Sequence, residues 1–244
     1  MTIAWVTGIK GFLGRHLAKR LSSQGVNTSG LDISSWTDVE AAEWGVSEFL
    51  TGDITTQNLD LLAAKTGAPD HIFHLAGGSS VGFSIQLPEE DFRRTVASTV
   101  PLLEWVRVHS PHTRLVMSSS AAVYGSGYAS PIAETAPLVP YSPYGYHKRM
   151  TELLFESYYR NYGLHTVVVR LFSVYGPELR KQLLWDVCVR LKENPRVLEL
   201  AGTGGEMRDW LHGRDAAAYM HVAIERASAG AVVNGAKGRL AGLE

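Results

Sequence analysis

Short apolar runs alternate with longer amphipathic segments along the first part of the chain. The apolar runs occupy residues 3–8, 26–33, 71–77, 114–120 and 165–172. Segments long enough for helices stand between them, including residues 13–23, 92–109 and 144–162. This alternation is typical of a parallel sheet with helices on both faces. The sequence therefore predicts an α/β fold built on a doubly wound parallel sheet.

The alternation weakens after Gly176. Helix-like segments follow at residues 181–194 and 213–227 without clear strands between them. We therefore expect a main domain at residues 1–175 and a smaller substrate-binding lobe at residues 176–244, set across the carboxyl edge of the sheet. The closing stretch GRLAGLE resembles a truncated end more than a buried element, so this lobe is expected to be partial.

The composition indicates a large core and argues against several classes of partner. The chain has 244 residues, 45% of them hydrophobic, and a net charge of −1. Acidic and basic residues are mixed along it, so neither nucleic acid nor a membrane surface is an expected partner. Cys188 is the only cysteine and cannot form an intramolecular disulfide. Because no leader-like start follows Met1 and no apolar run approaches about 20 residues, we expect a cytoplasmic location. No metal site is predicted.

A glycine-rich loop follows the first apolar run. In the stretch VTGIKGFLG, Gly8, Gly11 and Gly14 stand between a predicted strand and a helix that begins near Phe12 and Leu13. Glycine permits a tight turn and a close backbone approach, and the free N–H groups of a helix start suit an anionic diphosphate. The strand before and the helix after this loop predict that these five residues bind a dinucleotide. A glycine-rich turn without a ligand is the alternative.

Asp32 closes the second predicted strand, 18 residues after Gly14. In Rossmann-like folds an acidic side chain at this place accepts hydrogen bonds from the adenosine ribose hydroxyls. Its carboxylate would repel a 2′-phosphate, and no arginine stands among residues 33–35, which follow it. The sequence therefore predicts a Rossmann-like fold that binds NAD rather than NADP. A turn-capping role for Asp32 is the alternative.

Hydroxyl, phenol and ammonium groups meet at one predicted edge of the sheet. Ser118, Ser119 and Ser120 end one strand, Tyr144 follows 24 residues after Ser120, and Lys148 comes one helical turn later. Residues four apart share a helix face, so the ammonium can favour the phenolate by its charge. The phenolate can then remove a hydroxyl proton while a serine holds that hydroxyl. A solvated pair on a helix face is the alternative.

A series of motifs in this order resembles the extended short-chain dehydrogenase/reductases, specifically their NAD-dependent epimerase/dehydratase group, which acts on nucleotide sugars. The motifs are VTGIKGFLG, GDI at 52–54, HLAG at 74–77, SSSAAVYG at 118–125, PYGYHK at 143–148, RLFSVYGP at 170–177 and MRDWLHGRDAA at 207–217. They extend over nearly the whole chain, so the resemblance is far more specific than any one motif.

The resemblance implies cofactor contacts beyond the glycine loop. It places Asp53 and Ile54 at the adenine and lines the cofactor with Leu75, Ala76 and Gly77. It also implies that Ser120, Tyr144 and Lys148 are the catalytic residues. Tyr144 and Lys148 are expected to contact NAD as well, with Lys148 at the nicotinamide ribose.

The substrate side is also implied by the resemblance. It places Ser79, Ser120, Ser173 and Arg208 at a nucleotide-sugar substrate, with Arg208 on its diphosphate. A surface ion pair of Arg208 with Asp209 or Asp215 is the alternative. Tyr124 is expected to be structural.

The sequence departs from the family pattern in three places. Thr95 and Ser173 stand where relatives usually carry asparagine, which weakens the expected cofactor-side and substrate-side hydrogen bonds. Ala121 and Ala122 stand where 4,6-dehydratases place an Asp-Glu pair. Relatives also continue for several tens of residues beyond a point corresponding to Glu244, in agreement with a partial lobe.

These departures select among the reactions of the group. Without the Asp-Glu pair, water elimination is disfavoured, and the residues of the decarboxylating relatives are also missing. The sequence therefore predicts an NAD-dependent nucleotide-sugar 4-epimerase that acts through a transient 4-keto sugar. The alternatives are an NAD(P)H-dependent keto-sugar reductase on the same scaffold and a dinucleotide-sensing protein without catalysis.

A homodimer is the expected assembly. The helix-like segments at residues 92–109 and 144–162 carry more apolar and aromatic residues than one sheet face requires. In the family that the chain resembles, the corresponding helices often pair across a two-fold axis.

Overall fold

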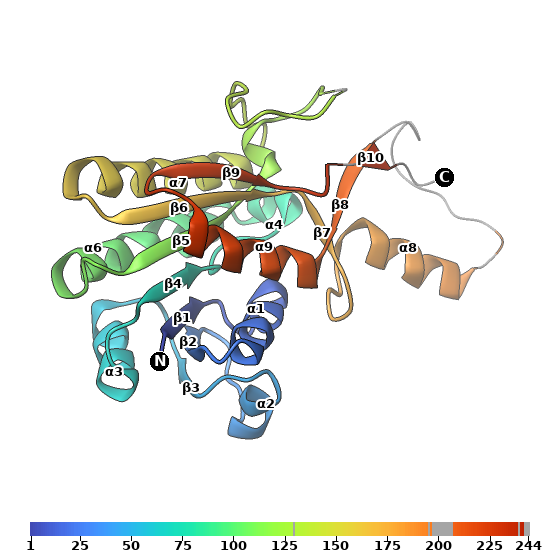
Figure 1. The fold of residues 1–244 in the computed structure, drawn as a ribbon. Helices are drawn as coiled ribbons and strands as arrows, with labels where there is room; N and C mark the ends of the chain where they lie inside the picture. The colour runs from blue at the N-terminus through green and yellow to red at the C-terminus, as the bar shows by residue number, and fades with distance from the viewer. Residues whose placement is uncertain (129, 195, 197–206, 239, 242–244) are drawn as a thin grey trace.

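The central feature of the molecule is a sheet of seven parallel strands in the order β3-β2-β1-β4-β5-β6-β9 (Figure 1). The computed structural model describes residues 1–128, 130–194, 196, 207–238 and 240–241. The strands are β1 (Ile3–Thr7), β2 (Asn27–Asp32), β3 (Glu48–Thr51), β4 (His71–His74), β5 (Arg114–Ser120), β6 (His165–Leu171) and β9 (Ala231–Gly235). The strand order changes direction between β1 and β4, so the predicted Rossmann-like, doubly wound α/β fold is confirmed.

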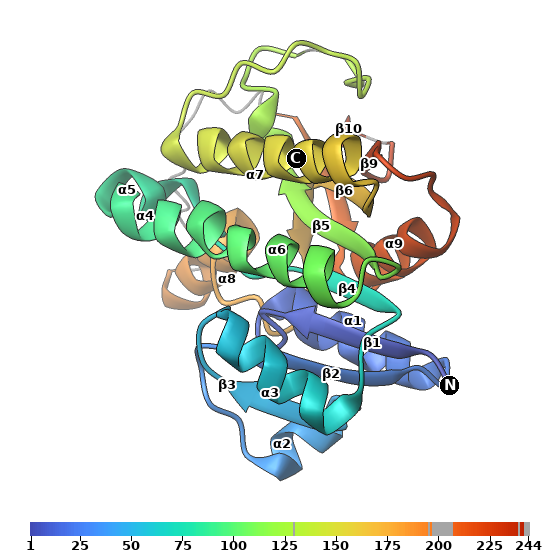
Figure 2. The same ribbon diagram turned by 90° about the vertical axis from the view of Figure 1, so that its left-hand side faces the viewer.

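Helices cover both faces of this sheet (Figure 2). One face carries α1 (Phe12–Ser23), α2 (Asp38–Glu43) and α9 (Gly213–Arg226). The opposite face carries α3 (Thr56–Thr66), α6 (Thr99–His109) and α7 (Pro143–Tyr162). Strands between two helical layers are buried on both sides, which explains why they appear in the sequence as continuous apolar runs.

Successive residues of β1 show how the two layers are separated. Ala4 and Val6 pack in the core cluster that includes α1 and α9, whereas Trp5 packs in the cluster that includes α3 and α6. The ring of Trp5 lies 5.1 Å from that of Trp105, measured between centroids, and its Nε1 donates a hydrogen bond to Thr66 Oγ1. The alternation of a strand therefore assigns each side chain to one of two separate cores.

The helix predicted at residues 92–109 is interrupted. It consists of α5 (Pro88–Phe92), a π-helical turn (Arg93–Ala97) and α6. The carbonyl of Thr95 accepts hydrogen bonds from the hydroxyls of Thr99, at 2.7 Å, and Thr151, at 3.3 Å. Thr95 Oγ1 in turn accepts the N–H of Gly78 at 2.7 Å. The π-helical turn therefore holds the loop after β4, as such turns often do near functional sites.

The predicted division at residue 175 does not follow the sheet. Strand β9 pairs with β6 as the seventh strand of the main sheet, and α9 packs in one core cluster with α1. The lobe contains α8 (Gln182–Glu193) and a small sheet of β7 (Ser173–Tyr175), β8 (Arg208–His212) and β10 (Leu240–Ala241). Much of the closing segment that was interpreted as a truncated end lies outside the described residues. The main domain therefore includes α9 and β9, which the sequence assigned to the lobe.

Candidate active site

A cleft of about 1420 Å³ lies at the carboxyl edge of the main sheet. This volume exceeds the roughly 300–1,000 Å³ of a pocket for one small ligand, so the cleft has room for a dinucleotide and a second molecule. The residues that the sequence predicts for cofactor, substrate and catalysis all line it: Gly8, Gly11, Phe12, Leu13, Gly14, Asp32, Asp53, Ile54, Leu75, Ala76, Gly77, Ser79, Ser120, Tyr144, Lys148, Ser173 and Arg208. The topology therefore brings together residues from both ends of the sequence.

The glycine loop enters the cleft between β1 and α1. A Cβ atom at Gly14 would lie 2.3 Å from the carbonyl oxygen of Gly8, and one at Gly8 would lie 2.8 Å from the nitrogen of Ala76. Gly8 also has a φ of 70°, a conformation that side chains disfavour. Gly11 provides no side-chain cap for α1, so the first N–H groups of that helix are left for a ligand.

Asp32 lies at the end of β2 and is partly engaged by the backbone. Its Oδ2 accepts the N–H of Lys10 at 3.1 Å, and its Oδ1 accepts the N–H of Ser34 at 3.0 Å. The side chain still lines the cleft. The turn-capping alternative is thus observed, and the geometry leaves lone pairs of the carboxylate for ribose hydroxyls.

Two further predicted positions follow β3. Ile54 is buried while lining the cleft, and the side chain of Asp53 is exposed. Asp53 Oδ1 lies 3.7 Å from a guanidinium nitrogen of Arg93, a contact between distant segments that the sequence does not reveal. The exposed pair forms part of the rim of the cleft.

The loop after β4 approaches α7. The N–H of Ala76 donates to Thr7 Oγ1, and Gly77 has a φ of 139°. A Cβ atom at Gly77 would lie 3.3 Å from Thr95 Oγ1 and 3.6 Å from Lys148 Nζ. Glycine at this position therefore permits close contact between the loop and Lys148.

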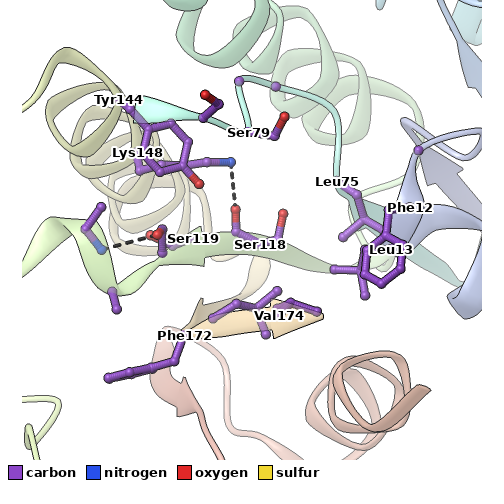
Figure 3. A pocket seen from close by; sticks show the side chains of 18 of the residues that line it. Phe12, Leu13, Leu75, Ser79, Ser118, Ser119, Tyr144, Lys148, Phe172 and Val174 are labelled. Atoms are coloured by element: carbon purple, nitrogen blue, oxygen red, sulfur yellow. Dashed lines mark hydrogen bonds between the residues drawn. The ribbon is translucent and has the colours of Figure 1, made fainter. Parts of the chain in front are cut away.

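Tyr144 and Lys148 lie on one face of α7, as the spacing predicts. Helix α7 begins with Pro143 after Ser142, whose hydroxyl accepts the N–H of Gly145. Lys148 Nζ lies 5.9 Å from the centroid of the Tyr144 ring and donates a hydrogen bond to the Ser118 carbonyl at 3.0 Å (Figure 3). The helix start and the strand end thus place both groups at the same point of the cleft.

The electrostatics of this pair differ from the prediction. Burial lowers the pKa of Lys148 to about 8, although the Asp91 and Glu152 carboxylates act in the opposite direction. Burial also raises the pKa of Tyr144, an effect that a hydrogen bond with Ser120 partly offsets. The expected lowering of the phenol pKa by the lysine is therefore not observed. The reason is that Lys148 directs its ammonium at the Ser118 carbonyl, while partial burial of Tyr144 disfavours its phenolate.

A buried charge cluster behind the catalytic edge was not predicted. Arg170 donates two hydrogen bonds of 2.9 Å to the carboxylate of Glu152, and Ser119 Oγ donates to the same carboxylate at 2.6 Å. The hydroxyl of Ser119 is therefore hydrogen-bonded in the interior, whereas Ser120 is the serine that faces Tyr144. Glu152 stands one helical turn after Lys148, and this spacing is the signal in the sequence that identifies it.

Tyr124 and Asn234 extend this cluster to a wall of the cleft. Tyr124 Oη accepts a hydrogen bond from Arg170 and donates to Asn234 Oδ1 at 2.7 Å. The amide of Asn234 donates to the Ile132 carbonyl at 2.7 Å, and its backbone N–H donates to Glu134 Oε1 at 2.9 Å. Tyr124 is thus structural, as expected, and β9 holds the loop before α7 in place.

A second buried pair lies beside α7. Asp91 Oδ2 is 2.6 Å from Nδ1 of His147, and the Asp91 side chain is fully buried. Its Oδ1 makes no hydrogen bond within the part of the chain that the structure describes. Asp91 lies in a run of acidic residues and gives no signal in the sequence that separates it from its exposed neighbours.

The substrate side of the cleft is formed by the lobe. Ser173 on β7 is half-buried, and Arg208 at the start of β8 is exposed toward solvent. The neighbouring Asp209 accepts the backbone N–H groups of Lys237 and Gly238, each at 2.7 Å. A further cation, Lys181, lines the cleft and was not predicted.

The described part of the chain has neither a membrane-spanning helix nor a cluster of metal ligands. None of the helices at 1–128, 130–194 and 207–238 is long and apolar enough to cross a membrane. Within the same described part, no group of three or more His, Cys, Asp or Glu side chains could hold a metal ion. Cys188 is exposed.

Comparisons with known proteins show the family to which the chain belongs. The NAD dependent epimerase/dehydratase family matches residues 4–235. The chain is 30% identical to a UDP-glucose 4-epimerase of Azospirillum brasilense, over 87% of this chain and 65% of that protein. It is 30% identical to a CDP-paratose 2-epimerase of Salmonella typhi, over 91% of this chain and 75% of that one. The chain thus spans about two thirds to three quarters of the length of these relatives.

The fold also matches solved structures. A crystal structure of the UDP-glucose 4-epimerase of Thermus thermophilus in complex with NAD superposes with a TM-score of 0.86 at 27% identity. The match covers 99% of this chain and 79% of that one.

Proposed function

Because this chain belongs to the NAD-dependent epimerase/dehydratase family, we propose that it is an NAD-dependent nucleotide-sugar 4-epimerase. In the proposed reaction a ring hydroxyl is oxidised to a transient 4-keto sugar, the sugar turns, and hydride returns to the opposite face. The observation that carries the proposal is the convergence of Ser120, Tyr144 and Lys148 beside the glycine loop, in a cleft with room for two ligands.

The cradle around the glycine loop supports a dinucleotide. Side chains at Gly8 and Gly14 would fill it, and the uncapped start of α1 faces a place suited to a diphosphate. Asp32 would accept the adenosine ribose hydroxyls, and Lys148 would hold the nicotinamide ribose. When bound, NAD supplies the acceptor and donor of hydride.

The proton is handled by groups of this chain. Tyr144 Oη would take the proton of the reacting hydroxyl, and Ser120 Oγ would keep that hydroxyl oriented toward it. Burial raises the pKa of Tyr144, so the phenol is the resting form, and the hydrogen bond with Ser120 acts in the opposite direction. The same Tyr144 would return the proton when the keto sugar is reduced.

Ala121 and Ala122 favour epimerisation over elimination. Both line the cleft in the turn after β5, where they offer no acidic or basic group. A 4,6-dehydratase needs a proton donor and acceptor beside the sugar to remove water. The family contains both classes of enzyme, so these two alanines support the narrower assignment.

A keto-sugar reductase is the second candidate, because Ser120, Tyr144 and Lys148 line the same cleft and the Tyr144 phenol could donate a proton to a carbonyl during reduction. Such an enzyme would consume reduced cofactor, whereas an epimerase would form NADH and oxidise it back to NAD within each cycle.

The test is incubation of the protein with a panel of nucleotide sugars, followed by NMR detection of isomers without added cofactor. Isomer formation with no lasting change of absorbance at the wavelength of reduced cofactor supports the epimerase. Stoichiometric loss of NADH with a keto sugar would transfer the assignment to the reductase. If the protein binds cofactor but catalyses neither reaction, the alternative of a dinucleotide-sensing protein would be favoured.

We also propose that NAD is preferred over NADP, because Asp32 would repel a 2′-phosphate. Titration of both cofactors with the unmodified protein tests this preference. The double variant with Asp32→Gly and Ile33→Arg should reduce the ratio of NAD affinity to NADP affinity about tenfold. Asp32→Asn is the matched control, because it keeps one acceptor for the N–H groups of Lys10 and Ser34. Equal affinity of the unmodified protein for both cofactors would refute the argument.

A homodimer through α6 and α7 is also proposed. Apolar side chains on these helices are exposed in the single chain, namely Val100, Val108, Tyr146, Met150, Leu153 and Tyr162. Pairing two copies of this surface would remove them from water. Light scattering at micromolar concentration tests the proposal, and a monomer mass there would refute it.

A further inference from the structure

Lys181 places a positive charge in the cleft. Its Nζ donates a hydrogen bond to Ser79 Oγ, which is neutral. Among the residues that the structure describes, no carboxylate lies within ion-pair distance of this ammonium. The carboxylate of Glu178, three residues earlier, lies instead 3.4 Å from the guanidinium of Arg15.

The position of Lys181 is not explained by helix stability. Lys181 is the residue before the first turn of α8, and its side chain makes no capping hydrogen bond. A cation at the start of a helix is electrostatically unfavourable, because the exposed N–H groups there are also positive. Lys181 is exposed while it lines the cleft, and nearby protein lowers the pKa of its ammonium. The ammonium therefore stabilises neither the helix nor an ion pair.

The backbone around Lys181 is held in an uncommon conformation. Glu178 has a φ of 75° and Gln182 a φ of 70°, the non-glycine residues with positive φ in the described part of the chain. Side chains disfavour this region, and such strain is concentrated at ligand-binding segments. These two residues flank Lys181 in the lobe. The side chain of Lys181 reaches from there to Ser79 in the loop after β4.

Ser79 fixes which end of the cleft Lys181 faces. Ser79 stands two residues after Gly77, and a Cβ atom at Gly77 would lie 3.6 Å from Lys148 Nζ. Asp32 and Asp53, the predicted contacts of the adenosine, belong to β2 and the loop after β3 instead. Figure 3 shows Ser79 on the same side of the cleft as Tyr144 and Lys148. Lys181 is thus a cation at the reacting end of the cleft.

We propose that Lys181 is a substrate-binding residue that pairs with an oxyanion of the nucleotide sugar. The oxyanion is a phosphate of the diphosphate or a carboxylate carried by the sugar, and both would replace the neutral Ser79 hydroxyl as the partner of the ammonium. The inference rests on the proposed function, because it assumes a nucleotide sugar in this cleft. Lys181 and Arg208 then supply two cations from the lobe.

The test compares Lys181→Gln with the unmodified protein by calorimetric titration with UDP, UDP-glucose, UDP-glucuronate and NAD. Lys181→Gln should weaken at least one uridine nucleotide about tenfold or more, the usual effect of losing a hydrogen bond to a charged group. Lys181→Arg should restore most of the affinity. Lys192→Gln, an exposed lysine later on α8 and outside the cleft, is the matched control and should bind every probe normally.

The probes separate the two sources of the oxyanion. An equal loss for UDP and UDP-glucose identifies the diphosphate, and a loss confined to UDP-glucuronate identifies the carboxylate. If Lys181→Gln binds all three nucleotides normally, the inference is overturned. The same holds if the variant loses affinity for NAD alone. In both cases the proposed function still stands. If the unmodified protein binds none of the three nucleotides and converts no nucleotide sugar, both proposals fall together.

Discussion

The two walls of the cleft are built in opposite ways. The wall of β5 and α7 is buried and paired, with the side chains of Glu152 and Arg170 only 2% and 4% exposed. The wall of the lobe is open, because α8 has no buried residue and Lys181 faces a neutral hydroxyl. The difference shows that the groups proposed for proton transfer are held by packing. The groups proposed for substrate contact are supported by few neighbours.

Removal of the buried cation should produce the largest effect on the packed wall. Arg170→Met leaves Glu152 with the half-exposed Arg149 as the cation in direct contact, so the free energy of unfolding should fall by about 3 kcal/mol. Urea denaturation measures this loss. Arg149→Met is the matched control and should cost less than about 1 kcal/mol. Equal losses in the two variants would contradict the distinction between buried and exposed pairing.

Tyr144→Phe tests the catalytic group on the same wall. Turnover should fall by about a hundredfold or more, because the variant cannot take or return the proton. NAD binding and the melting temperature should change little, since the ring and its packing remain. Steady-state kinetics and cofactor titration measure both parts. Unchanged turnover would remove Tyr144 as the base, and Ser120→Ala should cost less than Tyr144→Phe.

The pKa of Lys148 predicts a pH dependence of stability. Its folded pKa of about 8 lies below the usual value of a lysine, so the unfolded chain binds more protons between about pH 8 and 10. The free energy of unfolding should therefore rise with pH in this window, by about 2 kcal/mol relative to Lys148→Met. Denaturation at several pH values measures the difference. A constant difference between the two proteins from pH 7 to 10 would contradict the lowered pKa.

The smallest effect is expected on the open wall. Trp185 on α8 is 40% exposed, so Trp185→Ala should change the free energy of unfolding by less than about 0.5 kcal/mol. Leu103→Ala, at a fully buried position of α6, should cost about 2–5 kcal/mol. Thermal and urea denaturation of both variants provide the comparison. A large loss for Trp185→Ala would show that α8 is packed against a partner.

Local spacing made much of this site predictable from the sequence. The glycine loop, Asp32 and the pair of Tyr144 and Lys148 each depend on a strand end or a helix turn, and those patterns are short. The cleft contains all of them. The lowered lysine pKa and raised tyrosine pKa could not be predicted, because burial depends on residues distant in the chain.

Contacts between distant segments explain the remaining differences. Arg170 lies 18 residues from Glu152, and Asp91 lies 56 residues from His147, so neither pair leaves a periodic signal. Strand β9 was assigned to the lobe because its pairing with β6 crosses about 64 residues, a separation that hydrophobic periodicity does not report. The sequence thus predicted groups that the structure brings together in the cleft and missed the supports that hold them.

The hydrogen bonds of Asn234 have a consequence for the order of events during synthesis. Asn234 holds Ile132 and Glu134, which line the cleft, yet it is translated about a hundred residues after them. A nascent chain halted before β9 would already contain the glycine loop and α7. It would lack the hydrogen bonds from Asn234 to Ile132 and Glu134. Ligand affinity would therefore increase late, when β9 has joined β6 and Asn234 holds this wall.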